Sequence, residues 1–433
     1  MSALEKLIPI LTPTLKEQLY GVGGAIRDHI LKGHGAATAT GDIDLACSMP
    51  PKAMREAFEQ IGLKVIPTGW KHGTITVLSG DQKYEITSFR SEKGYSDFRH
   101  PDEVVFNVTL EEDLSRRDFT MNALAIPLAR MLDESWDSFL VDPFGGRKDI
   151  HQKLIRCVGN PNERFTEDPL RMLRACRFAS QLDFQIHPLT LEAMAIKANL
   201  IRHVSRERIV DEINKLLVTN NPKGFQVAIK TGLLDEIFET KTLCRTYSKN
   251  QPLRIKESCS LGERWFLLLD WVTKAHDMNS QKTHFDQFLN KFPLANRESD
   301  LIRSLFESQS IISTIDQHAS FQTEEEIYKL RLVLSQIKQQ GLDPLCFLRV
   351  HSVAVPLLND LESSWVKVLS TNPPLLIDDL SLKPAKIIEF YQLTPGSWIR
   401  SVQDFLLDHV LRKPHDNNEV TLMNLLHHFK ITA

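Results

Sequence analysis

The stretch that decides the fold reads Leu19-Tyr20-Gly21-Val22-Gly23-Gly24-Ala25-Ile26-Arg27-Asp28 and resumes, after a gap, as Gly41-Asp42-Ile43-Asp44-Leu45-Ala46. Its first four residues are typical of a short strand, and the two glycines end that strand before a helix over residues 25–31. Glycines between a strand and a helix N-terminus let backbone N–H groups approach a phosphate closely, and the helix dipole favours the anion. The stretch therefore predicts a phosphate-binding turn.

Two carboxylates follow the gap. Asp42 and Asp44 lie two residues apart in a segment that predicts a strand, so both side chains share one face while Ile43 and Leu45 face the core. A pair of carboxylates beside a phosphate-binding turn suits Mg²⁺, a hard cation that prefers oxygen ligands and substrate phosphates. Taken alone, Gly-Gly is usually a turn and Asp-x-Asp a solvated loop. In this order they predict a phosphoryl- or nucleotidyl-transfer site in which Asp42 and Asp44 are catalytic and bind the metal.

Composition limits the remaining possibilities. A chain of 433 residues is too long for one ordinary core, so we expect two to four domains. The net charge of −3 does not indicate a general nucleic-acid binder, so a basic surface must be local; residues 147–208 hold twelve Lys and Arg against seven Asp and Glu. No apolar run approaches the ~20 residues of a membrane span. The six cysteines lack Cys-x-x-Cys spacing, which argues against a zinc site or a disulfide framework. We therefore expect a cytoplasmic enzyme without a signal peptide or membrane segment.

The next segments predict a hairpin and a loop. Residues 72–77 and 84–89 alternate around Gly80-Asp81, which is typical of a β-hairpin. Glu85 lies on the opposite face from its apolar neighbours, so it is either a third carboxylate near the metals or a surface or structural residue. Residues 90–106 are charged and contain glycine and proline, which predicts a mobile loop, and loops over a site often carry function.

Two later segments carry further polar candidates. The run 111–123 contains Arg116, Arg117, Asp118 and Asn122, which mix phosphate donors with groups able to bond ribose hydroxyls; the alternative is a solvated helix.

Residues 167–179 predict a helix opened by acids and a proline. Steps of three keep Asp168, Arg171 and Arg174 within about a third of its circumference, with Arg177 further round and Phe178 packing inward. Salt bridging is the alternative role of this face. Strand patterns fade after residue 150, and residues 201–433 are expected to be almost wholly helical.

Five linked blocks now resemble one family, the class II tRNA nucleotidyltransferases and bacterial poly(A) polymerases, within the polymerase-β-like nucleotidyltransferases. The blocks are residues 23–28, 41–44, 116–123, 142–146 and 167–178. The resemblance implies an α+β chain, with an α/β nucleotidyltransferase head followed by an all-helical neck, body and tail. It places the catalytic head at 1–147, a neck that recognises the nucleotide base at 148–220, and a body and tail that bind tRNA at 221–433.

The resemblance also implies an activity, the addition of C, C and A to the tRNA 3′ end from CTP and ATP without a nucleic-acid template. It assigns two Mg²⁺ ions to Asp42 and Asp44. Nucleotide binding is assigned to Gly24 and Arg27 at the triphosphate, Arg117, Asp118 and Asn122 at the phosphates and ribose, Asp168 and Arg171 at the base, and Arg174 and Arg177 in support. Two alternatives stay open: an A-adding or poly(A)-adding enzyme, and a non-catalytic tRNA-binding protein, against which the intact aspartates argue.

Overall fold

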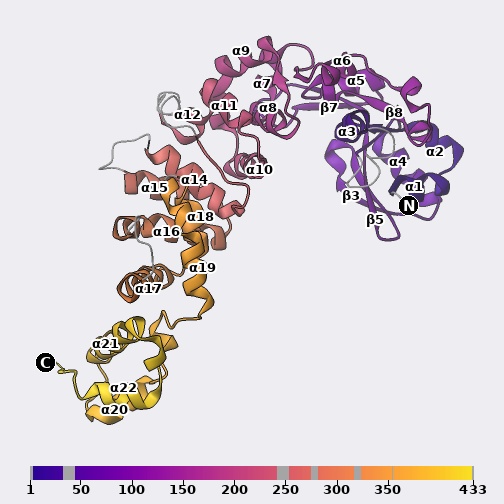
Figure 1. Cartoon of the computed structure of the whole chain (residues 1–433). Helices are drawn as coiled ribbons and strands as arrows, with labels where there is room; N and C mark the ends of the chain where they lie inside the picture. The colour runs from indigo at the N-terminus through magenta and orange to yellow at the C-terminus, as the bar shows by residue number, and fades with distance from the viewer. Residues whose placement is uncertain are drawn as a thin grey trace. The chain divides into compact units, whose positions relative to one another are not determined.

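The computed structural model describes residues 3–32, 44–240, 253–274, 281–315, 323–353 and 355–431. The chain divides into two compact units, Met1–Pro252 and Leu253–Ala433, which we call unit 1 and unit 2 (Figure 1). Unit 1 combines a mixed β-sheet with helices, and the described part of unit 2 is helical. The predicted α+β class is therefore confirmed, while the domain boundaries at 147/148 and 220/221 stay predictions.

A six-stranded sheet forms the centre of the amino-terminal part of unit 1. Its order is β3-β4-β5-β2-β1-β8, with β2 and β5 parallel and the other neighbours antiparallel. The predicted hairpin is formed by β4 and β5, which pair antiparallel. Tyr84 and Ile86, which share one face of β5, are both buried. The strands are β1 Leu19–Val22, β2 Leu45–Cys47, β3 Lys64–Gly69, β4 Thr74–Ser79, β5 Gln82–Ser88 and β8 Ala125–Pro127.

Short helices cover this sheet. The apolar side chains of Met54 and Phe58 are fully buried and pack helix α4 on strands β3 to β5, and α3 follows β1 directly, so the predicted strand–glycine–helix turn is confirmed. The helices and 3₁₀ turns here are α1 Ala3–Leu7, η1 Ile8–Ile10, α2 Pro13–Gln18, α3 Gly24–Lys32, α4 Pro51–Gln60, η2 Trp70–His72, α5 Leu110–Ser115, η3 Thr120–Asn122, η4 Leu128–Arg130 and η5 Trp136–Phe139.

The stretch 90–106, predicted as a mobile loop, instead contains a β-hairpin. Strands β6 (Arg90–Lys93) and β7 (Glu103–Phe106) pair antiparallel as a two-stranded sheet. The sequence conceals this hairpin because charged side chains, rather than an apolar face, hold it. Arg90 and Arg116 both donate to Glu92, at 2.7 and 3.2 Å.

Helices make up the rest of unit 1, apart from a short parallel pair, β9 (Leu154–Ile155) and β10 (Gln185–Ile186). Helix α8 is the centre of this part, because α7, α10 and α11 all pack on it. Gly224 allows α11 to approach α8 closely, since a Cβ there would lie 2.2 Å from the Cys176 carbonyl oxygen. The helices are α6 Gly146–His151, α7 Pro161–Glu167, α8 Leu170–Gln181, α9 Pro188–Lys197, η6 Ala198–His203, α10 Arg206–Leu217, α11 Lys223–Lys230 and α12 Leu233–Phe238.

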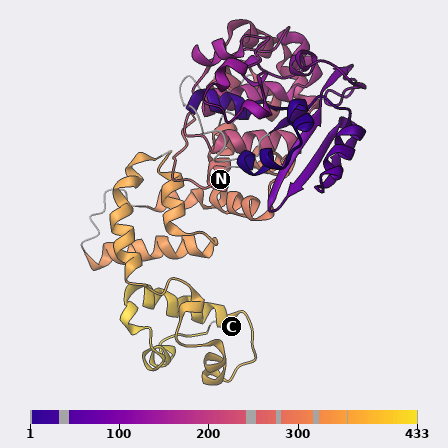
Figure 2. The ribbon, with the colours of Figure 1, turned by 90° about the vertical axis from the view of Figure 1, so that its right-hand side faces the viewer.

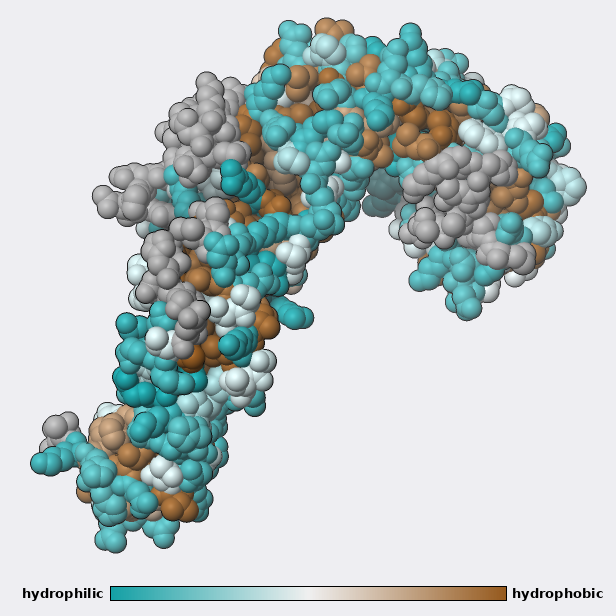
Figure 3. Space-filling model, viewed as in Figure 1, coloured by the Kyte–Doolittle hydropathy of each residue, from teal (hydrophilic) through white to brown (hydrophobic). Residues whose placement is uncertain are grey.

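The described part of unit 2 is helical (Figure 2) and is organised around α14, whose residues from Gly262 to Thr273 are all buried. Helices α15 and α16 pack on it, and α17 packs on α18, α19 and α21. On the face seen in Figure 3, both units present mainly hydrophilic residues. The elements are α14 Leu261–Lys274, α15 Gln281–Lys291, α16 Asn296–Glu307, η8 Ser308–Thr314, α17 Glu324–Gln339, α18 Pro344–His351, η9 Pro356–Leu361, α19 Glu362–Ser370, η10 Ile377–Asp379, α20 Pro384–Tyr391, α21 Trp398–Arg412, η11 Pro414–Asp416 and α22 Glu419–Leu426.

Candidate active site

A cavity of about 600 Å³ in unit 1 collects most of the predicted site residues. Its wall comes from the β1–α3 turn, the start of β2, strand β5, the segment after α5, and helices α8 and α10. The predicted residues that line it are Gly24, Arg27, Asp44, Arg117, Asp118, Asn122, Asp168, Arg171 and Arg174. Arg177 is not part of the lining, and Asp42 lies outside the described residues.

The first glycine of the turn, Gly23, cannot be replaced by a larger residue without strain. Gly23 has φ +74°, a left-handed conformation that side chains rarely adopt. A Cβ there would also lie 2.9 Å from Nη1 of Arg117 and 3.7 Å from Oδ2 of Asp44. Helix α3 starts at the next residue, so its N-terminal N–H groups lie at the cavity wall beside two arginines. This combination favours an anion.

Asp44 directly precedes strand β2 and is exposed to solvent. The parallel pairing of Leu45 with Ile86 places Asp44 opposite Glu85 of β5, and both carboxylates line the cavity. No cluster of three or more potential metal ligands forms among the residues that the structure describes, a set that excludes Asp42. The two carboxylates nevertheless supply the oxygen donors that a hard divalent cation prefers.

Asp118 is ionised inside the cavity wall. Its Oδ2 accepts from Nη2 of Arg174 at 2.7 Å, and its Oδ1 accepts from the Asn122 amide at 3.0 Å. Burial alone would raise the pKa of Asp118, but Arg174 and Asn122 lower it to about 2. Asn122 also accepts from Nη1 of Arg27 at 2.8 Å, so one amide joins the arginine of α3 to the buried carboxylate.

Arg117 is held beside the glycine turn. Its Nη1 donates to the Asn122 carbonyl at 3.5 Å, and its Nη2 lies 3.6 Å from Oδ2 of Asp113. Burial lowers the pKa of Arg117, and the Asp113 carboxylate acts in the opposite direction. A guanidinium stays protonated in proteins, so it contributes positive charge where α3 begins.

The structure corrects the prediction that Asp168 lies on one helix with Arg171 and Arg174. Helix α7 ends at Glu167, α8 begins at Leu170, and Asp168 between them is extended, with φ −141° and ψ 99°. The physical reason is Pro169, since a residue before proline is sterically disfavoured in the helical region. Asp168 accepts from the Leu170 N–H at 3.1 Å and from Nη2 of Arg208 at 2.8 Å.

The arginines of α8 have different partners. Arg171 donates to Glu167 at 2.7 Å and to the Arg116 carbonyl at 3.1 Å, and it lines the cavity. Arg174 also lines the cavity, and Asp118 raises its pKa. Arg177 instead donates to the buried Glu212 at 2.7 Å. The predicted supporting role of Arg177 can therefore act only through its neighbours.

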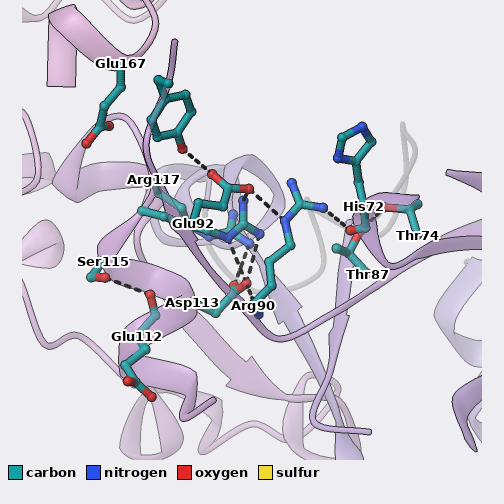
Figure 4. Close-up of polar contacts among 12 residues, drawn as sticks. His72, Thr74, Thr87, Arg90, Glu92, Glu112, Asp113, Ser115, Arg117 and Glu167 are labelled. Atoms are coloured by element: carbon teal, nitrogen blue, oxygen red, sulfur yellow. Dashed lines mark hydrogen bonds and ion pairs between the residues drawn. The ribbon is translucent and has the colours of Figure 1, made fainter. Parts of the chain in front are cut away.

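Sequence reasoning assigned no site role to Arg90 or Arg208, which line the cavity together with Arg116, a candidate phosphate donor of the run 111–123. Figure 4 shows Arg90, Glu92 and Asp113 close together, where the hairpin β6–β7 meets helix α5. Arg116 donates to Asp113 at 2.8 Å, and Arg90 also donates to the His72 carbonyl. No local pattern identifies Arg208, because its partner Asp168 lies 40 residues earlier in the chain.

Comparison with known proteins agrees with this geometry. Residues 19–156 match a family model described as the poly A polymerase head domain. Residues 183–242 match one described as the probable RNA and SrmB-binding site of polymerase A. Fold and site thus place unit 1 among proteins built on a polymerase-β-like nucleotidyltransferase head.

The chain belongs, more narrowly, to the CCA-adding enzyme family. It is 33% identical over 403 residues to the CCA-adding enzyme of Ligilactobacillus salivarius, with 89% of each chain covered. It is 44% identical over 235 residues to that of Bacillus subtilis (strain 168), and this alignment spans only about half of each chain, 54% of ours and 55% of the relative. The crystal structure of the Bacillus stearothermophilus CCA-adding enzyme in complex with CTP superposes with a TM-score of 0.70 at 27% identity, covering 99% of this chain and 98% of that one.

In the described part of the chain, every helix is too short or too polar to span a bilayer.

Proposed function

We propose that this chain is a CCA-adding tRNA nucleotidyltransferase, which adds C, C and A to the tRNA 3′ end from CTP and ATP without a nucleic-acid template and releases pyrophosphate. One observation carries the proposal. A single cavity brings together a glycine turn at a helix N-terminus, the Asp44 carboxylate and the pair Asp168 and Arg171. These are, in that order, groups suited to phosphates, to a metal ion and to a base edge.

We assign the divalent metal of this chemistry to Asp42 and Asp44, with Glu85 as a third carboxylate beside them, and we propose that it is Mg²⁺. The donor set supports this assignment, because Mg²⁺ takes carboxylate and phosphate oxygens. When bound, such ions activate the primer hydroxyl and stabilise charge on the triphosphate and the leaving pyrophosphate. Gly23 leaves room beside Asp44, since a Cβ there would lie 3.7 Å from Oδ2.

The remaining groups bind and orient the nucleotide. Arg27, Arg117 and the N–H groups at Gly24 face the position of the triphosphate, where their charge offsets that of the phosphates. Asp118 is ionised and accepts hydrogen bonds, and Asn122 both donates and accepts, which suits ribose hydroxyls.

Asp168 and Arg171 would select the base. C and A share one pattern on their Watson–Crick edges, an amino donor beside a ring-nitrogen acceptor, and U and G present the reverse. A carboxylate only accepts and a guanidinium only donates, so this pair matches C and A and mismatches U and G. Glu167 and the carbonyls of Arg164 and Arg116 engage three of the five N–H groups of Arg171, which leaves two for a base.

We further propose a function for each of the three predicted parts of the chain. The head, 1–147, performs the chemistry, residues 148–220 read the base, and residues 221–433 bind tRNA in the cytoplasm, where the substrate is found. The basic stretch 147–208 supports contact with the acceptor end, because Lys and Arg outnumber the acids there.

Single-nucleotide incorporation tests the function. The full chain is given three tRNAs, ending before the first C, before the second C and before A, each with one of the four triphosphates and Mg²⁺. We expect C on the first two, A on the third and no further extension. Addition of A alone indicates an A-adding enzyme, long A tails a poly(A) polymerase, and tRNA binding without incorporation a non-catalytic protein.

The hairpin β6–β7 provides a finer test. We propose that it reshapes the cavity for ATP once both cytidines are in place, because Arg90 at its base lines the cavity. Replacing residues 94–102 by Asn-Gly keeps the Lys93–Glu103 pair and closes it with a two-residue turn. C addition should persist while the final A is lost. Equal loss of both would assign the hairpin a general folding role.

A further inference from the structure

Among the described residues that line the cavity, Phe178 is the one aromatic residue, and three arginines gather around it. The Cζ atoms of Arg27, Arg174 and Arg177 lie over its ring, at 5.1, 5.5 and 4.1 Å from the centroid. All three distances are within the ~6 Å at which a ring face attracts a cation. Packing of an apolar helix face accounts for one buried ring but not for three like charges around it.

The ring joins arginines from different parts of the chain. Arg27 belongs to α3, while Arg174 and Arg177 belong to α8. The plane of the ring is fixed by Phe119, whose own ring lies edge-on to it at 88° and 5.9 Å. Phe178 is 5% exposed and Phe119 is fully buried, so neither ring is free to turn away.

A second, polar route joins the same two cavity arginines. Arg27 donates to Asn122, Asn122 donates to Asp118, and Arg174 also donates to Asp118. This route holds the edges of the guanidiniums, whereas the ring contacts their Cζ atoms. Arg27 and Arg174 are therefore coupled twice, once through their N–H groups and once through the ring of Phe178.

We propose that Phe178 is a positioning residue, an aromatic platform that holds Arg27 and Arg174 as a pair aimed at the nucleotide phosphates. The inference rests on the proposed function and adds to it a residue that touches the phosphate-binding groups. The negative face of the ring offsets the mutual repulsion of the guanidiniums, which an aliphatic residue of similar size cannot do. Arg177, outside the cavity lining, is the third guanidinium near this ring.

The test compares equilibrium binding of CTP and CMP to the full chain in the presence of Mg²⁺. Phe178→Leu should weaken CTP binding by about tenfold, between the effects of an exposed and of a desolvated cation–π contact, and CMP binding by less than about twofold. Phe184→Leu is the matched control, because Phe184 is equally buried (1% exposed) but lies outside the cavity lining. Phe178→Met, which also removes the ring, should reproduce Phe178→Leu.

A double-mutant cycle distinguishes a general packing defect from an effect of the ring that acts through the arginines. In an Arg27→Gln background, Phe178→Leu should weaken CTP binding by less than about threefold, because the ring acts through the arginines. Equal loss of CTP and CMP, a matching loss in Phe184→Leu, or additive effects in the cycle would overturn the inference. If the wild type incorporates C and A normally but Phe178→Leu binds CTP as tightly as the wild type, the role of Phe178 is overturned while the proposed function stands. Absence of CTP binding by the wild type overturns the proposed function as well.

Discussion

The two units treat buried ionisable side chains in different ways. In unit 1, Asp118 is buried yet stays ionised, with its pKa lowered to about 2, and it lines a cavity. In unit 2, His351 is 3% exposed, and burial lowers its pKa to about 3, so it stays neutral between Phe266 and Phe347. Asp118 thus keeps its charge at the wall of a cavity, whereas His351 carries no charge in a helical core.

Two arginine–carboxylate pairs, one in each unit, extend the comparison. Arg174 binds Asp118 beside the cavity, and Arg349 binds Glu263 where α18 meets α14. Each carboxylate is almost fully buried, and each arginine is about one-third exposed. Because the two pairs have similar burial, any difference in their function depends on the residues around them. Beside Arg174 lie further arginines and the glycine turn, and beside Arg349 lie packed helices.

The largest effect that separates the units concerns Asp44. Asp44→Ala should reduce addition of both C and A by at least about 10²–10³-fold, the range seen when one group that stabilises transition-state charge is removed. Because Asp44 is exposed, thermal stability and tRNA binding should stay close to wild type. Single-turnover incorporation and filter binding measure the two properties. The control is Asp81→Ala in the exposed β4–β5 turn; substantial turnover by Asp44→Ala would contradict the assignment.

The next effect concerns selectivity. An unpaired buried polar group costs about 1–3 kcal/mol, so two mismatched groups support roughly 10²–10⁴-fold discrimination. Arg171→Ala and Asp168→Ala should each narrow the advantage of CTP and ATP over UTP and GTP by about 10-fold or more. Incorporation of the four triphosphates measured in parallel gives the ratios. Arg202→Ala, which breaks a pair with Glu236 away from the cavity, should leave them unchanged. If both site variants keep the wild-type ratios of incorporation among the four triphosphates, Asp168 and Arg171 have only a structural role.

The two ion pairs themselves provide a smaller, direct comparison. Arg174→Gln and Arg349→Gln should each lower the free energy of unfolding by about 1–2 kcal/mol, a value reduced for the partial exposure of both arginines. Only Arg174→Gln should also weaken CTP binding, by about 10-fold. Calorimetry and equilibrium binding on the two variants test this, and a loss of CTP affinity in Arg349→Gln would remove the distinction between the units.

The last effect is a pH dependence of stability that comes from unit 2. The pKa of His351 is lowered on folding, so the unfolded chain binds its proton first as the pH falls. The stability contributed by the neutral form is complete above about pH 6.5 and is lost progressively as the pH falls toward 3. By pH 5 the loss is about 2 kcal/mol. His351→Gln should show a correspondingly smaller drop in Tm between pH 7 and 5, and an equal drop would assign that pH dependence to other groups.

Much of the fold and site could be predicted because their signals are local. The strand, the two glycines and the helix at residues 19–32 follow one another directly in the sequence. The apolar residues after Asp44 predict a strand, and they form β2, which pairs with β5. The acid–proline pattern at residues 168–169 predicts the start of a helix, but Asp168 itself lies outside the helix, because the helical region is disfavoured for a residue before proline. The β6–β7 hairpin has no local sequence signal, because its stability depends on Arg116, ten residues beyond its end. Arg208 has no local signal at all.

The composition of the cavity wall has a consequence for inhibitor design. Of its described residues, seven are arginines and four are acids, in a volume of about 600 Å³. A neutral, apolar compound of that size would strip water from guanidiniums without replacing the lost hydrogen bonds, at about 1–3 kcal/mol or more for each. Compounds that occupy this space tightly therefore need anionic groups of their own, and a permeable inhibitor must carry them in a masked form or bind elsewhere on the protein.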